Sequence, residues 1–447
     1  MKATCICFTV FSGLLFSAGC INPKQGAANL LNPPFVNQSS IAKTQDVPGD
    51  SLVFKLIAGR PELFNSILSR KDELNIQVIY TQIDRSKKAK DKVKFTDHTF
   101  NLNPGNYFYP ASTVKLPIAI LALQKLNELN IRGLNKYTTM ITGEDGDGQT
   151  EVINDPSAPD GRPTIAHYIK KILLVSDNDA FNRLYEFLGQ EYIHTTLNKM
   201  GYGDVRIIHR LSISLTEDQN RHTNPVNFID TAGNVIYSKP AEKSSMRYEP
   251  RTTSARNYLL GSGYIAGEEL VNEPFDFSKK NLLPLGVLHD IVKSIMFPES
   301  MEKEKQFNLS KEDYDFLRLY MSMRPGESKW PVYNNENYWD NYVKMIFYGA
   351  EKVVPQDGIR IFNKTGTAYG FLVDACYFAD FKNSVEFLLS AVIYCNSDGI
   401  FNDDKYDYKS VGYPFLKNLG RVIYDHELKR QKKNPAGLSA FHFNYTE

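Results

Sequence analysis

The sequence predicts an α+β fold in which both chain ends build one antiparallel sheet flanked by helices, and the middle forms an all-helical subdomain. Strand-like segments lie near the two ends, and a long stretch with helical spacing separates them. With 42% hydrophobic residues among 447, the chain can bury at least one large core. We therefore expect one folded domain without internal repeats.

The N-terminal half begins with a helix and two strands. Residues 51–70 repeat apolar side chains at helical spacing, and residues 76–80 and 96–102 are predicted strands. A strongly helical run, 114–129, follows Ser112, and its proline lies near the first turn, where proline is tolerated. The remaining predicted elements are helices at 164–175 and 179–188, strands at 359–363, 373–378 and 385–394, and an amphipathic helix at 415–430.

Composition divides the chain into four parts. A stretch rich in Asn, Gln, Pro, Gly and Ser is typical of a flexible tether, and turn signals mark a long insertion before the C-terminal strands. The predicted parts are a signal peptide at 1–19, a lipid-anchored tether at 20–50, a folded domain at 51–430 with an insertion at about 215–280, and a C-terminal tail at 431–447.

The first twenty residues are typical of an export signal. A basic start is followed by an apolar run to Phe16, then by Ser17-Ala18-Gly19 before Cys20. Small residues before a cysteine resemble a bacterial lipoprotein processing site, which implies a diacylated Cys20 and anchoring without a membrane-spanning helix. An ordinary signal peptide with an incidental cysteine is the alternative. We expect an envelope lipoprotein facing the periplasm or the cell exterior.

Two cysteines remain beyond the signal and Cys20, and both lie in a predicted hairpin. With a turn near Lys382-Asn383, antiparallel register places Cys376 opposite Leu389 or Ser390 rather than opposite Cys395. The sequence therefore predicts two buried free thiols.

Charge and histidine spacing exclude several classes of partner. The chain has 52 Lys plus Arg against 51 Asp plus Glu, so no global field favours nucleic acid. The histidines show no metal-ligand spacing among themselves or with cysteine. We expect no metal, no cofactor and no nucleic acid partner.

Three short motifs carry chemistry: Ser112-Thr113-Val114-Lys115, Ser176-Asp177-Asn178 and Lys364-Thr365-Gly366. Singly, each is explained by a helix cap or a turn. In the first, however, a serine and a lysine three residues apart share one helix face, so the amine can accept the hydroxyl proton.

Together and in this order, the motifs resemble the class A β-lactamase and penicillin-binding protein superfamily. The first two motifs begin 64 residues apart, which is close to the family spacing. The resemblance implies that Ser112 is the acylated nucleophile, Lys115 its proton acceptor or relay, and Ser176 a proton shuttle. The implied substrate-binding residues are Asn178, Lys364, Thr365, Gly366 and Thr367, with backbone N–H groups of Ser112 and Thr367 forming an oxyanion hole.

The sequence departs from the class A pattern in two places. Ser212 stands where the family has the glutamate that activates water, and Glu217, the nearest acid, is predicted to be a solvated loop residue. The second and third motifs begin 188 residues apart, which points to the insertion at about 215–280. By position, this insertion could cap the cleft, supply a water-activating group or contact a larger substrate.

Three functions remain open. The first is an exported serine hydrolase that opens β-lactam rings through an acyl-enzyme at Ser112. The second is a D,D-peptidase or penicillin-binding protein acting on peptidoglycan stem peptides, favoured by the missing glutamate. The third is a non-catalytic cell-wall binding protein, which needs neither Ser112 nor Lys115.

Overall fold

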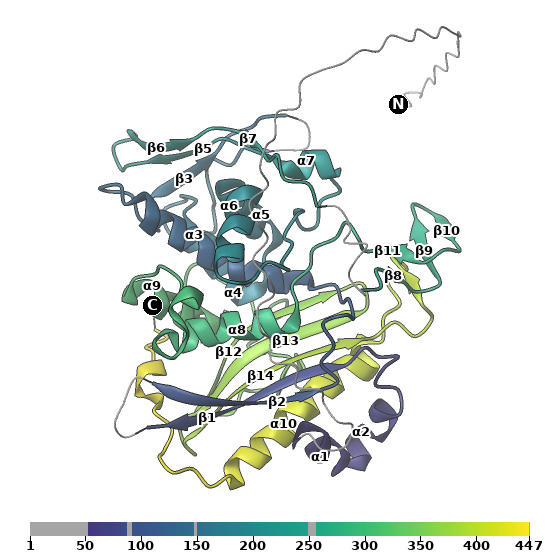
Figure 1. Cartoon of the computed structure of the whole chain (residues 1–447). Coiled ribbons are helices and arrows are strands. Elements are labelled where there is room, and N and C mark those ends of the chain that lie inside the picture. The colour runs from purple at the N-terminus through teal and green to yellow at the C-terminus, as the bar shows by residue number, and fades with distance from the viewer. Residues whose placement is uncertain (1–51, 87–91, 147–149, 249–255, 447) are drawn as a thin grey trace, which may run out of the picture. The chain divides into compact units, whose positions relative to one another are not determined.

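The structure, a computed structural model, describes residues 52–86, 92–146, 150–248 and 256–446 (Figure 1). The predicted signal peptide, Cys20 and the tether lie outside these residues. Within the described ranges, no helix has the length and apolar character that crossing a bilayer requires.

A five-stranded antiparallel sheet joins the two ends of the described chain (Figure 1). Its order is β12-β13-β14-β1-β2, so the C-terminal strands meet the N-terminal pair where β14 bonds to β1. This topology confirms the predicted fold class. The strands are β12 (Ile359–Ala368), β13 (Phe371–Asp380), β14 (Val385–Tyr394), β1 (Gln77–Arg85) and β2 (Val93–Phe100).

Helices cover both faces of this sheet. Helix α8 (Leu285–Met296) packs on one face against β13, β14 and β1, while α10 (Tyr413–Lys429) packs on the other face against β14. Every residue of β13 is buried, because both of its faces lie in a core. That double burial explains its nearly continuous apolar sequence.

The predicted N-terminal helix is interrupted. The structure has two helices, α1 (Leu52–Ala58) and α2 (Pro61–Leu68), separated by Gly59 and Arg60. Proline at the first position of α2 cannot continue the preceding helix, because it lacks the N–H donor, but it is well placed to begin a new one.

A helical subdomain is built from the middle of the chain. Its helices are α3 (Lys115–Leu129), α4 (Ile165–Val175), α5 (Asn178–Leu188), α6 (Gln190–Lys199) and α9 (Lys311–Ser322). It is not purely helical as predicted, because a small antiparallel sheet of order β3-β5-β6 accompanies the helices. Its strands are β3 (Thr139–Thr142), β5 (Val226–Ile229) and β6 (Val235–Lys239).

The segment predicted as an insertion, at about 215–280, forms short elements in two places among its described residues. Its first part contains α7 (Glu217–Arg221) and the strand pair β4 (His222–Thr223) and β7 (Glu242–Lys243). Its second part contains β8 (Leu259–Leu260), β9 (Gly263–Ala266), β10 (Glu269–Val271) and β11 (Phe275–Asp276). Strand β9 also pairs in parallel with β15 (Ile400–Phe401), which follows β14. The insertion is thereby tied to the end of the main sheet.

The predicted hairpin register is present. Cys376 of β13 lies opposite Leu389 of β14, and both Cys376 and Cys395 are free and buried. Burial raises the pKa of each thiol. The two cysteines are therefore small apolar core residues, as expected.

The C-terminal segment, expected as a separate tail at 431–447, packs on the domain over its described residues, 431–446. Leu438 and Phe441 are buried, and the Phe441 ring lies 4.8 Å from the ring of Tyr377 on β13. The guanidinium of Arg360 lies 3.6 Å from the ring centre of Tyr445. These aromatic side chains cover sheet surface that a solvated tail would leave open to water.

Candidate active site

Ser112 lies in a 3₁₀ helix, η1 (Ala111–Val114), directly before α3. The preceding residue, Ala111, has φ 46°, a left-handed conformation that is costly for a residue with a side chain. Strand β12 crosses close to this turn at Gly366, where an added Cβ would lie 2.9 Å from the Ser112 nitrogen. Only glycine fits this approach without displacing the backbone beside Ser112.

Lys115, one turn further on, is fully buried and forms hydrogen bonds with residues of both of the first two motifs. Its Nζ lies 2.8 Å from Ser112 Oγ, 2.6 Å from Asn178 Oδ1 and 3.2 Å from Ser176 Oγ. It also donates to the Ser176 carbonyl oxygen. The structure therefore brings Ser112, Lys115, Ser176 and Asn178 into one hydrogen-bonded group.

This environment favours the neutral amine. Burial lowers the pKa of Lys115 to about 7, against a smaller opposing effect from the negative charge of Asp177. A neutral amine has two N–H donors and one lone pair. The Ser176 carbonyl oxygen and Asn178 Oδ1 are acceptors only, so they use both donors. The lone pair is left for the hydroxyl proton of Ser112.

The second motif forms the turn between α4 and α5. Ser176 ends α4 with φ 62°, and the side chain of Asp177 caps α5 by accepting from the Ala180 N–H at 2.8 Å. The cap that the sequence suggested as an alternative is therefore real. It is also what turns Ser176 and Asn178 towards Lys115.

Lys364 reaches the same group from β12. Its Nζ lies 2.8 Å from Ser176 Oγ and 2.8 Å from the Thr365 carbonyl oxygen. Burial and the neighbouring charge of Lys115 hold the pKa of Lys364 well below its ordinary value. An anionic ligand beside it would raise that pKa, because an opposite charge favours the ammonium form.

The two threonines that follow Lys364 in β12, Thr365 and Thr367, differ in their exposure to solvent. The Thr365 hydroxyl is buried, donates to the Val373 carbonyl oxygen at 3.1 Å and lies 2.8 Å from Met345 Sδ, and both of these partners lie outside the Ser112 group. Thr367 is exposed at the end of β12. Its hydroxyl is therefore the more accessible of the two.

Ser212 joins the site through Asn178. The Asn178 Nδ2 donates to Ser212 Oγ at 2.7 Å, while its Oδ1 accepts from Lys115. Among the described residues, no carboxylate forms a hydrogen bond or ion pair with Ser112, Lys115 or Asn178. Glu217 is exposed and pairs with Lys279 at 3.2 Å. Neither Ser212 nor Glu217 therefore supplies a carboxylate base to this group.

Glu186 of α5 holds both ends of the loop that carries Ser212. Its Oε1 accepts from Arg210 at 2.7 Å and its Oε2 accepts from the Asn224 N–H at 2.6 Å. The Glu186 and Arg210 side chains are each less than 5% exposed. This buried ion pair therefore fixes the loop from 211 to 223 relative to α5.

Another buried lysine, Lys344, which the sequence did not mark as a candidate, lies behind β12. The Nζ of Lys344 donates to Asn363 Oδ1 at 2.7 Å, and Asn363 Nδ2 donates to Asp374 Oδ1 at 2.8 Å. Burial lowers the pKa of Lys344 to about 7 and raises that of Asp374 to about 6. No local motif marks this group, because its members come from three separate segments.

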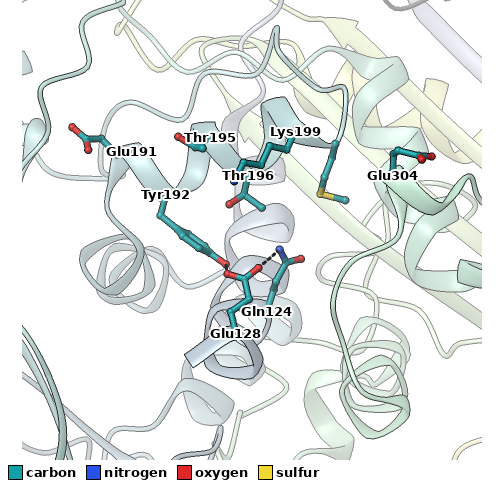
Figure 2. A pocket seen from close by; sticks show the side chains of 9 residues that line it. Gln124, Glu128, Glu191, Tyr192, Thr195, Thr196, Lys199 and Glu304 are labelled. Atoms are coloured by element: carbon teal, nitrogen blue, oxygen red, sulfur yellow. Dashed lines mark hydrogen bonds between the residues drawn. The ribbon is translucent and has the colours of Figure 1, made fainter. Parts of the chain in front are cut away.

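A pocket of about 400 Å³ lies elsewhere, between α3, α6 and Glu304 (Figure 2). Gln124 and Tyr192 both donate to the carboxylate of Glu128 there. None of its lining residues belongs to the three motifs. In the described part of the chain, no group of His, Cys, Asp or Glu side chains is arranged to hold a metal ion.

Comparison with known proteins finds one matching family model and several similar solved structures. The profile of the Beta-lactamase enzyme family matches residues 64–274, which contain the first two motifs. A β-lactamase structure from Sphaerobacter thermophilus DSM 20745 is 13% identical, with 84% of this chain and 97% of that chain covered and a TM-score of 0.43. A class A β-lactamase structure from Clostridium kluyveri DSM 555 is 13% identical, with coverages of 81% and 98% and a TM-score of 0.41. No curated protein matches this chain.

The profile match covers Ser112, Lys115, Ser176 and Asn178, whereas Lys364 lies beyond it. The structure brings that lysine to the same hydrogen-bonded group across 188 residues of sequence. The family match over residues 64–274 agrees with the resemblance inferred from the three motifs.

Proposed function

We propose that this protein is an exported serine hydrolase of the β-lactamase type that forms an acyl-enzyme with β-lactams at Ser112. The main support for this proposal is the buried Lys115 amine, whose nitrogen lies 2.8 Å from Ser112 Oγ. The other hydrogen-bond partners of this amine leave its lone pair for the Ser112 hydroxyl. A solvated lysine would be protonated at neutral pH and could not accept the proton. The family match supports the same reaction class.

Acylation can be written with the residues present. Lys115 accepts the Ser112 proton as Oγ bonds to the β-lactam carbonyl carbon, and the N–H groups of Ser112 and Thr367 stabilise the oxyanion. The C–N bond then breaks. The proton passes from Lys115 through the Ser176 hydroxyl, 3.2 Å away, to the departing nitrogen. Lys364, beside the same hydroxyl, pairs with a substrate carboxylate, and Gly366 allows the close approach.

We expect release of the acyl group to be slower than acylation. A water molecule needs a base near the ester, and Ser212, a poor base at neutral pH, occupies the loop position next to Asn178. This observation favours a long-lived acyl-enzyme and supports a second candidate function, a D,D-peptidase or penicillin-binding protein acting on peptidoglycan stems.

The first test is labelling with a fluorescent penicillin. We expect the wild-type protein to be labelled covalently and Ser112→Ala to remain unlabelled, because the attacking oxygen is absent. Ser214→Ala is a matched control, since Ser214 is exposed on the Ser212 loop, outside the Ser112 group. Equal labelling of wild type and Ser112→Ala would refute the proposed nucleophile. Absence of labelling in the wild type would favour the non-catalytic binding role.

The proposed location rests on the sequence of the first twenty residues. A lipid on Cys20 would hold the domain at an envelope membrane. We expect the full-length protein to sediment with membranes and Cys20→Ala to appear in the soluble envelope fraction. Equal membrane association of the two proteins in high salt and carbonate would show that Cys20 is not the anchor.

A further inference from the structure

Lys280, at the end of the insertion, has a cationic side chain with aromatic neighbours and no acidic partner. Its Nζ lies 5.6 Å from the ring centre of Phe275 and 5.8 Å from that of Tyr369. Within the described residues, it forms no ion pair with any carboxylate. Its neighbour Lys279, by contrast, is exposed and pairs with Glu217.

The rings beneath Lys280 connect it to the nucleophile. Tyr369 follows Thr367 by two residues, and its ring lies 5.0 Å from that of Tyr109, which precedes Ser112 by three residues. Phe275 of β11 stacks on Tyr369 with ring centres 5.6 Å apart. The insertion thus carries a positive charge to the edge of the Ser112 site.

The positive charges of Lys280 and Lys364 lie towards opposite sides of Thr367. Thr367, whose N–H group belongs to the proposed oxyanion hole, lies between Lys364 and Tyr369 along the chain, and Tyr369 directly follows β12. A substrate that places its carbonyl oxygen at Thr367 and its ring carboxylate towards Lys364 therefore extends its acyl group towards Tyr369. Lys280 meets that acyl group and not the leaving group.

A part-buried cation without an anion is poorly stabilised. Burial lowers the pKa of the Lys280 amine, and no neighbouring acid raises it. The facing ionisable group is His209, which stacks on Tyr109 and whose pKa burial lowers to about 4, so it supplies no negative charge. The contacts with two rings compensate only part of the lost hydration. An anionic ligand would complete the site.

We infer that Lys280 is a specificity-determining residue that binds a carboxylate on the acyl side of the substrate. The inference rests on the proposed acylation at Ser112 and extends it to a class of substrate, those with an anionic acyl side chain. The Phe275 and Tyr369 rings form the apolar floor on which the carbon part of that side chain lies.

A matched pair of substrates tests this inference. Benzylpenicillin and its α-carboxybenzyl analogue differ only by a carboxylate on the acyl side chain. We expect wild-type protein to be acylated by the carboxylated compound about tenfold more efficiently, as a charge-assisted hydrogen bond implies. Lys280→Met should remove this preference, Lys280→Arg should retain most of it, and Lys279→Met should leave it unchanged. The preference should also fall at high salt.

Equilibrium binding to Ser112→Ala separates the inference from the proposed chemistry. Calorimetry with the same two compounds reads their relative affinity without acylation, and we expect the same preference, lost in the Ser112→Ala, Lys280→Met double variant. If neither compound acylates the wild type but this binding preference exists, the proposed function fails and the Lys280 site stands. An absent preference, or one that survives Lys280→Met, overturns the inference even if acylation occurs.

Discussion

Lys115→Met is expected to lower the rate of acylation by benzylpenicillin by about 10²–10⁴-fold, the usual contribution of a positioned base. Methionine keeps the length and the apolar stem of the side chain but removes the nitrogen that lies 2.8 Å from Ser112 Oγ. Stopped-flow or quenched-flow measurement of adduct formation checks the loss. Lys94→Met, at an exposed position on β2, is the control and should acylate at the wild-type rate.

The same lysine predicts a pH dependence. Because its pKa is lowered to about 7, the amine is protonated and inactive below that pH and becomes a proton acceptor above it. The wild-type acylation rate should therefore rise as the pH increases through about 7, and the residual rate of Lys115→Met should lose that step. A wild-type profile that is flat from pH 5 to 9, or a full rate in Lys115→Met, would remove Lys115 from the role of base.

Glu186→Gln is expected to lower the free energy of unfolding by about 3–5 kcal/mol, because it leaves the buried Arg210 guanidinium without its counter-charge. Chemical denaturation of the folded domain measures the change. Glu62→Gln is the matched control, since Glu62 is exposed and lies 3.8 Å from Arg60, an arrangement that contributes little.

The Glu186 variant should also act on the site. Loosening Arg210 and Asn224 frees the loop that presents Ser212 to Asn178, so we expect slower acylation in the molecules that remain folded. Arg210→Lys should show the same two effects, lower stability and slower acylation. Lysine cannot reproduce the contacts of the guanidinium with Glu186 and the His222 carbonyl oxygen. Wild-type stability in Glu186→Gln would show that the ion pair does not hold the loop.

Features that depend on neighbouring residues in the chain could be predicted from the sequence. Strand β14 has the predicted bounds, 385–394, because its long apolar run lies between clear turn signals. The position of Cys376 opposite Leu389 followed from the turn at Lys382-Asn383 and the two-residue period of strands. Ser112 and Lys115 could be placed together because three residues of helix bring their side chains to one face.

Contacts between distant segments could not be predicted in this way. The pair of Glu186 with Arg210, the chain from Lys344 through Asn363 to Asp374, and the placement of Lys280 over Tyr369 depend on how loops pack. The small sheet of the helical subdomain likewise depends on a distant pairing, because its strands β3 and β5 lie more than eighty residues apart in the sequence. No periodicity within one segment encodes these pairings.

Acylation at Ser112 is tested most directly by intact-protein mass spectrometry over time after mixing the folded domain with benzylpenicillin, followed by peptide mapping. We predict a mass increase equal to one whole β-lactam, located on the peptide that contains Ser112, with slow return to the free mass because Ser212 replaces a carboxylate base. No adduct, or an adduct that still forms in Ser112→Ala, would rule out Ser112 as the acylated nucleophile.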